Sequence, residues 1–263
     1  MIGIALGVGL VAVAWALAPR LHRFAYWIAR SDRAALAALA TDGWERVVLQ
    51  PDAGVELVGL VRPPGAGAAD RTWILFLPGN AEHIARAFRP VLDGVLAGRP
   101  ERGALLVPWR GFDASTGTPS PQGLLADARA VWHHLTQGRG VAAADIELWG
   151  YSLGSGLAVQ LAAELCAAGT PPRRLVLLSA FDRIPVMRHG AFGRLLPGDV
   201  YDAVTAAPAV TCDAVLLHGT ADDALPIEGA RALRRALGGR SQWIELPGRG
   251  HVDYLAELGT LVP

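Results

Sequence analysis

The sequence predicts one α/β domain with a mixed, mostly parallel sheet of about eight strands, covered by helices on both faces and preceded by an N-terminal transmembrane helix. From residue 44 onward, short apolar runs alternate with helical patterns. The runs are almost continuously apolar, which is typical of strands buried on both faces between layers of helices. Ahead of them, residues 1–18 contain no charged side chain.

The composition indicates a folded chain and excludes several classes of function. Hydrophobic residues make up 52% of the 263 residues, and the formal net charge is zero. Because there is no basic cluster, nucleic acid is not an expected partner. All 24 basic side chains are arginine, so no lysine is present for a phosphate-binding loop or a Schiff base. Cys166 and Cys212 are the only cysteines, too few for a thiolate-rich zinc site.

Residues 1–18 are expected to form a transmembrane anchor. Eighteen helical residues span roughly 27 Å, close to a hydrocarbon core of about 30 Å. Trp15 lies near the end of the run, where an aromatic ring favours the membrane interface, and Pro19 and Arg20 end it. Two alternatives stay open. A cleaved signal peptide would use the small-x-small pattern at residues 16–18, and a helix buried in the protein core is the other.

The charges around this anchor predict a single-pass membrane protein whose domain faces the cytoplasm. Arg20, Arg23, Arg30 and Arg33 all follow the apolar run and none precedes it. Positive residues tend to stay on the cytoplasmic side, although a periplasmic or other external domain is the alternative. Residues 19–43 then form a juxtamembrane helix or linker, whose aromatic residues suit the headgroup region.

The main domain covers residues 44–263 and starts with a predicted hairpin. Its two strands are residues 44–50 and 55–61, joined by a turn at residues 51–54. Further strands are predicted at residues 72–77, 104–108, 146–149, 174–179, 214–219 and 242–246, and helices near residues 83–97, 121–137, 153–168, 227–237 and 252–258. A hairpin followed by repeated strand–helix units implies a mixed sheet in one domain.

Ser152 is the candidate nucleophile. It lies in Gly150-Tyr151-Ser152-Leu153-Gly154, a G-x-S-x-G motif between a predicted strand and a predicted helix. Such a motif forms a sharp strand-to-helix turn that lifts the serine hydroxyl out of the sheet. The alternative is an ordinary glycine-rich turn with a helix-capping serine.

A serine hydroxyl needs a base at neutral pH, and the base needs an orienting acid. Asp222 and His251 each follow a predicted strand, so both are expected at the same sheet edge as Ser152. Asp223 is adjacent to Asp222, and Asp182 after the preceding strand is the second candidate acid. The other histidines fit the base role less well: His22 flanks the anchor, His133 and His134 lie within a helix, His218 ends a strand, and His83 and His189 could line the pocket.

Two backbone amides are expected to bind the oxyanion of a tetrahedral intermediate. One belongs to Leu153, directly after the nucleophile, and the other to Asn80 in the loop after the third strand. Asn80 is the only asparagine in the chain, and the alternative role for it is a turn residue.

Taken together, these motifs resemble the α/β-hydrolase superfamily, in particular its ABHD-type, membrane-anchored bacterial serine hydrolases. The resemblance covers residues 44–260. Pro78-Gly79-Asn80-Ala81 stands where these proteins have H-G-N-A, so Pro78 departs from the pattern. Residues 110–120 match R-G-Y/F-x-x-S-x-G-x-P-S, and residues 218–226 match H-G-x-x-D-x-x-V/I-P with Leu225 as the aliphatic residue. The resemblance implies an α/β-hydrolase fold with Ser152, Asp222 and His251 as catalytic residues, and no cofactor or metal.

The substrate is expected to be a small-molecule or lipid acyl compound. Residues 181–213 form a short lid in which apolar side chains alternate with arginines. An apolar pocket wall favours acyl chains, and an anchor would bring lipid esters close. The expected reaction is hydrolysis of carboxylic esters or thioesters through an acyl-enzyme. The alternatives are a serine peptidase of the prolyl or aminopeptidase type, and a non-catalytic binding module on the same fold.

Overall fold

The computed structural model describes residues 33–67, 71–80, 83–184 and 201–263. The predicted anchor at residues 1–18 and most of the 19–43 linker lie outside these ranges. Within them, none of the helices has both the length and the apolar character needed to span a bilayer. The described part of the linker includes the short helix α2 (Arg33–Ala37), which packs Leu36 into the core.

The predicted fold is confirmed: the core is an eight-stranded mixed sheet in the order β1-β2-β4-β3-β5-β6-β9-β10. Only β2 runs antiparallel to its neighbours, and the remaining pairs are parallel. The strands are β1 (Glu45–Asp52), β2 (Val55–Arg62), β3 (Thr72–Leu77), β4 (Arg102–Leu106), β5 (Ile146–Tyr151), β6 (Arg174–Leu178), β9 (Ala214–Gly219) and β10 (Ser241–Leu246). Every side chain of β3, β5 and β9 is buried, as expected for strands covered on both faces.

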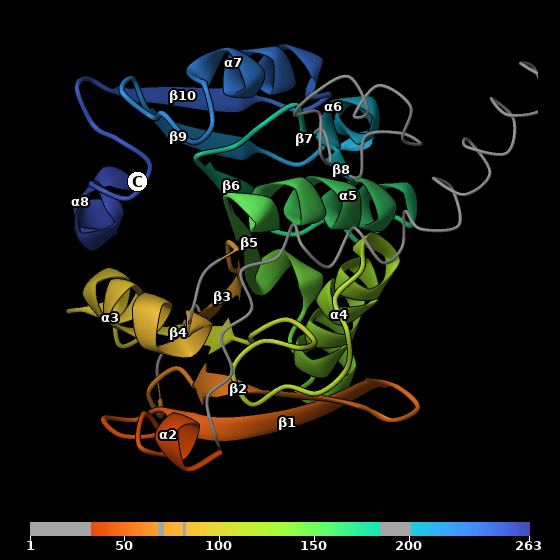
Figure 1. Cartoon of the computed structure of the whole chain (residues 1–263), viewed down its shortest axis with the longest axis vertical. Helices are drawn as coiled ribbons and strands as arrows, with labels where there is room; N and C mark the ends of the chain where they lie inside the picture. The colour runs from red at the N-terminus through yellow and green to blue at the C-terminus, as the bar shows by residue number, and fades with distance from the viewer. Residues whose placement is uncertain (1–32, 68–70, 81–82, 185–200) are drawn as a thin grey trace, which may run out of the picture.

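Helices cover both faces of the sheet (Figure 1). One face carries α3 (Ile84–Leu96) and α8 (Leu258–Leu261), and the other carries α4 (Pro121–His133) and α5 (Leu153–Ala167). The short α6 (Ala203–Ala206) packs against α5, and α7 (Ile227–Ala236) packs against β9. A π-helical turn at His134–Gly138 follows α4, and 3-10 turns lie at Ala143–Asp145, Ala207–Ala209 and Leu255–Glu257.

The helix predicted near residues 252–258 is shorter and begins later than expected. In its place the chain forms turns, a 3-10 turn and the four-residue α8. The carboxylate of Asp253 accepts a hydrogen bond from the backbone N–H of Gly250, at 2.7 Å. A local side-chain bond of this kind offers the backbone an alternative to a helix. The loop that carries His251 therefore stays non-helical.

A second, two-stranded sheet lies within the predicted lid. Arg183–Ile184 (β7) pairs antiparallel with Tyr201–Asp202 (β8), and the Arg183 Nε lies 3.2 Å from Asp202 Oδ1. Sequence periodicity did not predict these strands, because two residues are too short to show alternation. The pairing brings the two ends of the 185–200 segment together, and that segment itself lies outside the described residues.

A buried ion pair fixes the loop that follows β4. The Arg110 guanidinium contacts Asp127 of α4 at 2.6 Å, and the Arg110 backbone N–H donates to the same carboxylate at 2.9 Å. Burial raises the pKa of Asp127 above its usual value, although the hydrogen bonds from Arg110 oppose that shift. Next to this pair, the Trp109 indole donates to the Pro78 carbonyl at 3.1 Å. The loop after β4 is thereby attached to the loop after β3.

Candidate functional site

Ser152 lies at the sharp turn between β5 and α5. Its backbone has φ 51° and ψ −119°, a left-handed conformation that a residue with a side chain rarely adopts. The Ser155 hydroxyl and backbone N–H both donate to the Ser152 carbonyl, at 2.7 and 2.9 Å, which stabilises the turn. The Ser152 side chain therefore projects beyond the carboxyl end of the sheet.

The glycines that flank Ser152 are required by close backbone contacts. A Cβ on Gly154 would lie 2.0 Å from the Leu77 carbonyl oxygen at the end of β3. A Cβ on Gly150 would lie 2.6 Å from the Gly154 carbonyl oxygen. A side chain at Gly154 would push the turn away from β3, and one at Gly150 would push α5 away from β5. The G-x-S-x-G pattern thus reflects the packing of this turn against β3 and α5.

The structure brings Ser152, His251 and Asp222 together in one hydrogen-bonded chain. The His251 Nε2 lies 3.1 Å from Ser152 Oγ, and the His251 Nδ1 lies 2.8 Å from Asp222 Oδ2. The three residues come from the loops after β5, β9 and β10, which are neighbouring or near-neighbouring parallel strands. Such an arrangement lets the imidazole accept the serine proton while the carboxylate holds the ring.

The Asp222 carboxylate is fully buried and richly hydrogen-bonded. Its Oδ1 accepts the backbone N–H groups of Ala224 and Leu225, at 3.1 and 2.8 Å, while Oδ2 faces His251. Burial tends to raise the pKa of this carboxyl. The hydrogen bonds from the Leu225 backbone and from His251 outweigh burial and hold the pKa below its usual value. Asp222 is therefore ionised at neutral pH and stabilises positive charge on the imidazole.

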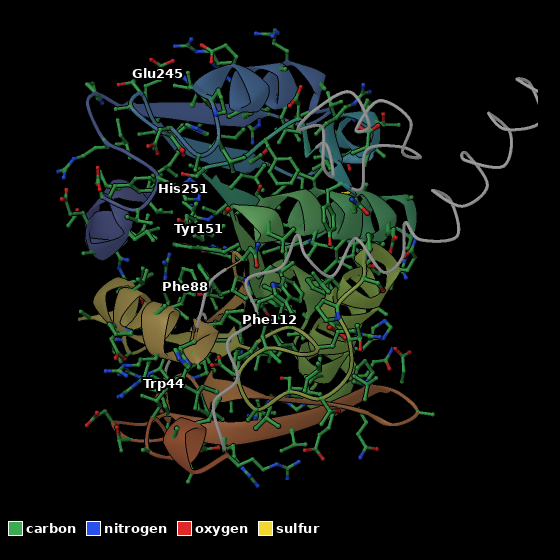
Figure 2. The ribbon with its side chains drawn as sticks, viewed as in Figure 1. Trp44, Phe88, Phe112, Tyr151, Glu245 and His251 are labelled. Carbon is green, nitrogen blue, oxygen red and sulfur yellow. The ribbon has the colours of Figure 1, made fainter. Side chains whose placement is uncertain are left out.

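The loop of His251 is fixed through its backbone carbonyl. The Tyr151 hydroxyl donates to the His251 carbonyl oxygen at 3.2 Å, and the Ser179 hydroxyl does so at 3.3 Å. The Tyr254 hydroxyl contacts Ser179 Oγ at 2.7 Å. Tyr151 and His251 also stack obliquely, with ring centroids 5.2 Å apart, and lie side by side in Figure 2. Sequence reasoning missed these hydroxyls, although Tyr151 stands next to the nucleophile in the motif.

His218 is a second histidine beside Asp222. Its Nε2 lies 2.9 Å from the Leu225 carbonyl oxygen and 3.4 Å from Asp222 Oδ2. The side chain is fully buried, and among the described residues Nδ1 has no hydrogen-bond partner. Burial lowers the pKa of His218, so the ring is neutral and donates from Nε2. This contact closes the turn that presents the Leu225 N–H to Asp222, so His218 supports the loop of the acid.

The loop after β3 lies directly against the nucleophile. A Cβ on Gly79 would lie 2.9 Å from the Tyr151 ring and 3.2 Å from the Ser152 Cβ. Asn80, the next residue, is therefore placed at the edge of the site. Leu153 is the first residue of α5, and the amides of a helix's first turn have no acceptor within the helix. Both predicted oxyanion amides thus belong to segments that border Ser152.

The remaining predicted alternatives lie away from this chain of contacts. Asp182 accepts a hydrogen bond from the Arg183 backbone N–H at 2.7 Å, and Asp223 is exposed. His83 lies at the start of α3, with Nδ1 3.7 Å from Asp113 Oδ1, in a pocket of about 260 Å³ that Leu36 and Leu39 help to line. His22 and His189 lie outside the described residues. Within residues 33–67, 71–80, 83–184 and 201–263, no group of three His, Cys, Asp or Glu side chains is arranged to hold a metal ion.

Comparison with known proteins gives sequence relatives. No family model matches the chain. This chain is 31% identical over 211 residues to the uncharacterized protein Rv2307c of Mycobacterium tuberculosis. The alignment covers 79% of this chain and 72% of that protein. This chain is also 30% identical over 218 residues to the lysophosphatidylserine lipase ABHD12 of Danio rerio, covering 70% of this chain and 56% of that protein. The chain thus spans about half the length of the lipase relatives that it matches.

Comparison of solved structures gives the same fold. An α/β hydrolase from Vibrio vulnificus superposes with a TM-score of 0.67 at 20% identity, covering 83% of this chain and 78% of that one. Est1E from Butyrivibrio proteoclasticus superposes with a TM-score of 0.59 at 14% identity, covering 82% of this chain and 95% of that one. At these identities the likeness concerns the fold.

Proposed function

We propose that the chain is a hydrolase of the α/β-hydrolase superfamily and that it cleaves carboxylic esters or thioesters of acyl substrates through a serine nucleophile. The observation that carries this proposal is the Ser152–His251–Asp222 chain, with contacts of 3.1 and 2.8 Å at the carboxyl edge of the sheet. The lipase relative supports a lipid-like acyl substrate.

In the proposed first half-reaction, Ser152 Oγ attacks the acyl carbon while His251 Nε2 takes its proton. The Asp222 carboxylate holds the imidazole and stabilises its positive charge. The backbone amides of Leu153 and Asn80 bind the oxyanion that forms on the carbonyl oxygen. The C–O or C–S bond then breaks, and His251 returns the proton to the departing alcohol or thiol.

In the second half-reaction, water attacks the acyl group on Ser152 and gives its proton to His251. The tetrahedral intermediate collapses, the carboxylic acid leaves and Ser152 recovers its proton. The chemistry needs only the side chains and amides named here, so the proposal includes no cofactor and no metal.

We also propose the arrangement that the sequence predicts for the whole chain. Residues 1–18 anchor it in a membrane, residues 19–43 form the juxtamembrane segment, and residues 44–263 form the hydrolase domain with a lid at about 181–213. The uncharged run of residues 1–18 supports the anchor, and the arginines that follow it support a cytoplasmic domain. Such an anchor would place the site near lipid substrates.

A substrate panel tests this function. Purified chain is assayed with nitrophenyl esters of increasing acyl length, an acyl thioester and a prolyl or alanyl anilide, alongside Ser152→Ala and the control Ser241→Ala at the start of β10. We expect ester and thioester hydrolysis that Ser152→Ala reduces by about 10³-fold or more and that Ser241→Ala leaves intact. Cleavage of the anilides alone would favour the peptidase alternative, and folded protein inactive on every substrate would favour a binding module.

A further inference from the structure

The only two cysteines of the chain meet in the folded protein. Cys166 lies in the last turn of α5, and Cys212 lies just before β9, with 45 residues between them in sequence. The backbone N–H of Thr211, next to Cys212, donates to Cys166 Sγ at 3.4 Å, which places the two cysteines close together. Both cysteines are reduced and partly exposed, so a small reagent can reach them.

The pair lies at the opposite end of α5 from the proposed nucleophile. Ser152 precedes the first residue of α5, whereas Cys166 lies in its last turn, and a helix of 15 residues is about 22 Å long. Cys212 likewise stands before β9, whereas the Asp222 loop follows that strand. Neither thiol takes part in the hydrolytic site, which leaves their proximity unexplained by that function.

The surroundings give the two thiols different reactivity. Burial tends to raise the pKa of Cys166, but hydrogen bonds from Thr211 and from the Cys212 backbone outweigh it and lower the pKa below the ordinary value. Burial and the neighbouring Cys166 raise the pKa of Cys212 to about 12. The thiolate is the nucleophile in thiol chemistry, so Cys166 is the thiol that reacts first.

We propose that Cys166 and Cys212 form an oxidation site, at which a peroxide converts the two thiols into a disulfide between the end of α5 and the start of β9. The Cys166 thiolate attacks one peroxide oxygen, the O–O bond breaks, and sulfenic acid and hydroxide form. Cys212 then attacks the sulfenic sulfur, the S–O bond breaks, and the hydroxyl leaves with the thiol proton as water. The two sulfurs together lose two electrons, and the peroxide is reduced.

The disulfide would enclose residues 167–211 in a covalent loop. This loop contains β6, the small β7–β8 sheet and most of the lid proposed at residues 181–213. Closing a loop of this length restricts the unfolded chain more than the folded one, so the oxidised protein is expected to unfold at a higher temperature. From loop-closure entropy, the expected rise in the unfolding midpoint is on the order of 10 °C.

The full chain is exposed to hydrogen peroxide, unreacted thiols are blocked with a maleimide, and peptides are mapped by mass spectrometry without reduction. We expect one intramolecular link between Cys166 and Cys212, a mass loss of about 2 Da and reversal by a dithiol. Cys212→Ser should stop at a sulfenic acid on Cys166 that dimedone traps, and Cys166→Ser should leave Cys212 reduced.

Three results would overturn the proposal. The first is that both thiols still react with the maleimide after treatment with peroxide. The second is that disulfides form only between separate chains. The third is that Cys212 in the Cys166→Ser variant oxidises at the wild-type rate. A disulfide that forms without any rise in the unfolding midpoint would refute the constraint on residues 167–211. None of these readouts depends on hydrolytic activity, so they are independent of the proposed function.

Discussion

Asp222→Asn tests the proposed role of the carboxylate most sharply, because the structure dictates how the new amide must turn. Oδ1 accepts two backbone N–H groups, from Ala224 and Leu225, so the amide oxygen has to stay at that position. The amide NH₂ then faces His251 Nδ1 and can only donate to it. The imidazole must present a lone pair at Nδ1 and its proton at Nε2, which points at Ser152 and prevents the ring from accepting the serine proton.

The opposite orientation of the side-chain amide that Asp222→Asn introduces is energetically unfavourable. It would place two backbone donors against the NH₂ group, and each buried donor left without an acceptor costs about 1–3 kcal/mol. The expected loss is therefore that of the wrong imidazole tautomer, which lowers kcat by about 10⁴-fold in a serine protease with the same substitution. That loss corresponds to about 5.4 kcal/mol in the activation barrier.

The assay is steady-state hydrolysis of the best nitrophenyl ester, with circular dichroism to show that each variant is folded. Asp223→Asn and Asp182→Asn are matched controls, because both are neighbouring aspartates outside the hydrogen-bonded chain. Each control is expected to keep its rate within about threefold of the wild type, because Asp223 is exposed and an asparagine at position 182 can still accept the Arg183 N–H. A folded Asp222→Asn variant with more than a tenth of the wild-type kcat would refute the reasoning, and a large loss in Asp182→Asn instead would move the role to that residue.

Three further outcomes are expected. Because hydrogen bonds hold the pKa of Asp222 below its usual value, this carboxylate should stay ionised down to about pH 4, the ordinary range of an aspartate. Carbon-13 NMR that finds Asp222 protonated above that pH in the folded protein would contradict this. Tyr151→Phe keeps the ring but removes the hydrogen bond from the hydroxyl to the His251 carbonyl oxygen. The kcat should therefore drop about 3- to 10-fold while KM stays unchanged. An unaltered kcat would show that this hydrogen bond does not position the loop of His251. Asp127→Ala leaves the buried Arg110 guanidinium without its main partner and should lower the free energy of unfolding by about 3–5 kcal/mol in urea titration, a value that a loss under 1 kcal/mol would rule out.

Much of the fold was predictable because most strands can be recognised from their own short apolar sequences. Continuous apolar runs such as residues 72–77 and 146–149 are typical of strands in a covered parallel sheet, and the structure forms strands there. The spatial order was not predictable, because β4 lies between β2 and β3 and nothing local specifies that crossover. The strands β7 and β8 were missed because two residues are too short to show an alternating pattern.

The site was predictable to the extent that it depends on loop position. Ser152, Asp222 and His251 each follow a strand whose end lies at one edge of the sheet, and the structure brings their side chains within hydrogen-bonding distance. Adjacent Asp222 and Asp223 share the same loop signal, so loop position alone does not separate them, whereas the H-G-x-x-D motif favours Asp222. Contacts such as the Ser179–Tyr254 bond, or the meeting of Cys166 and Cys212, join segments far apart in sequence and leave no local pattern.

Labelling with a fluorophosphonate probe tests the central proposal most directly, because the probe reacts with a serine only when the site activates it. The folded wild-type chain and Ser152→Ala are treated with the probe, and the adduct is located by peptide mass spectrometry. The proposed mechanism predicts one adduct on Ser152, absent from the variant. No labelling of the folded wild-type chain, or an adduct on a different serine, would contradict it.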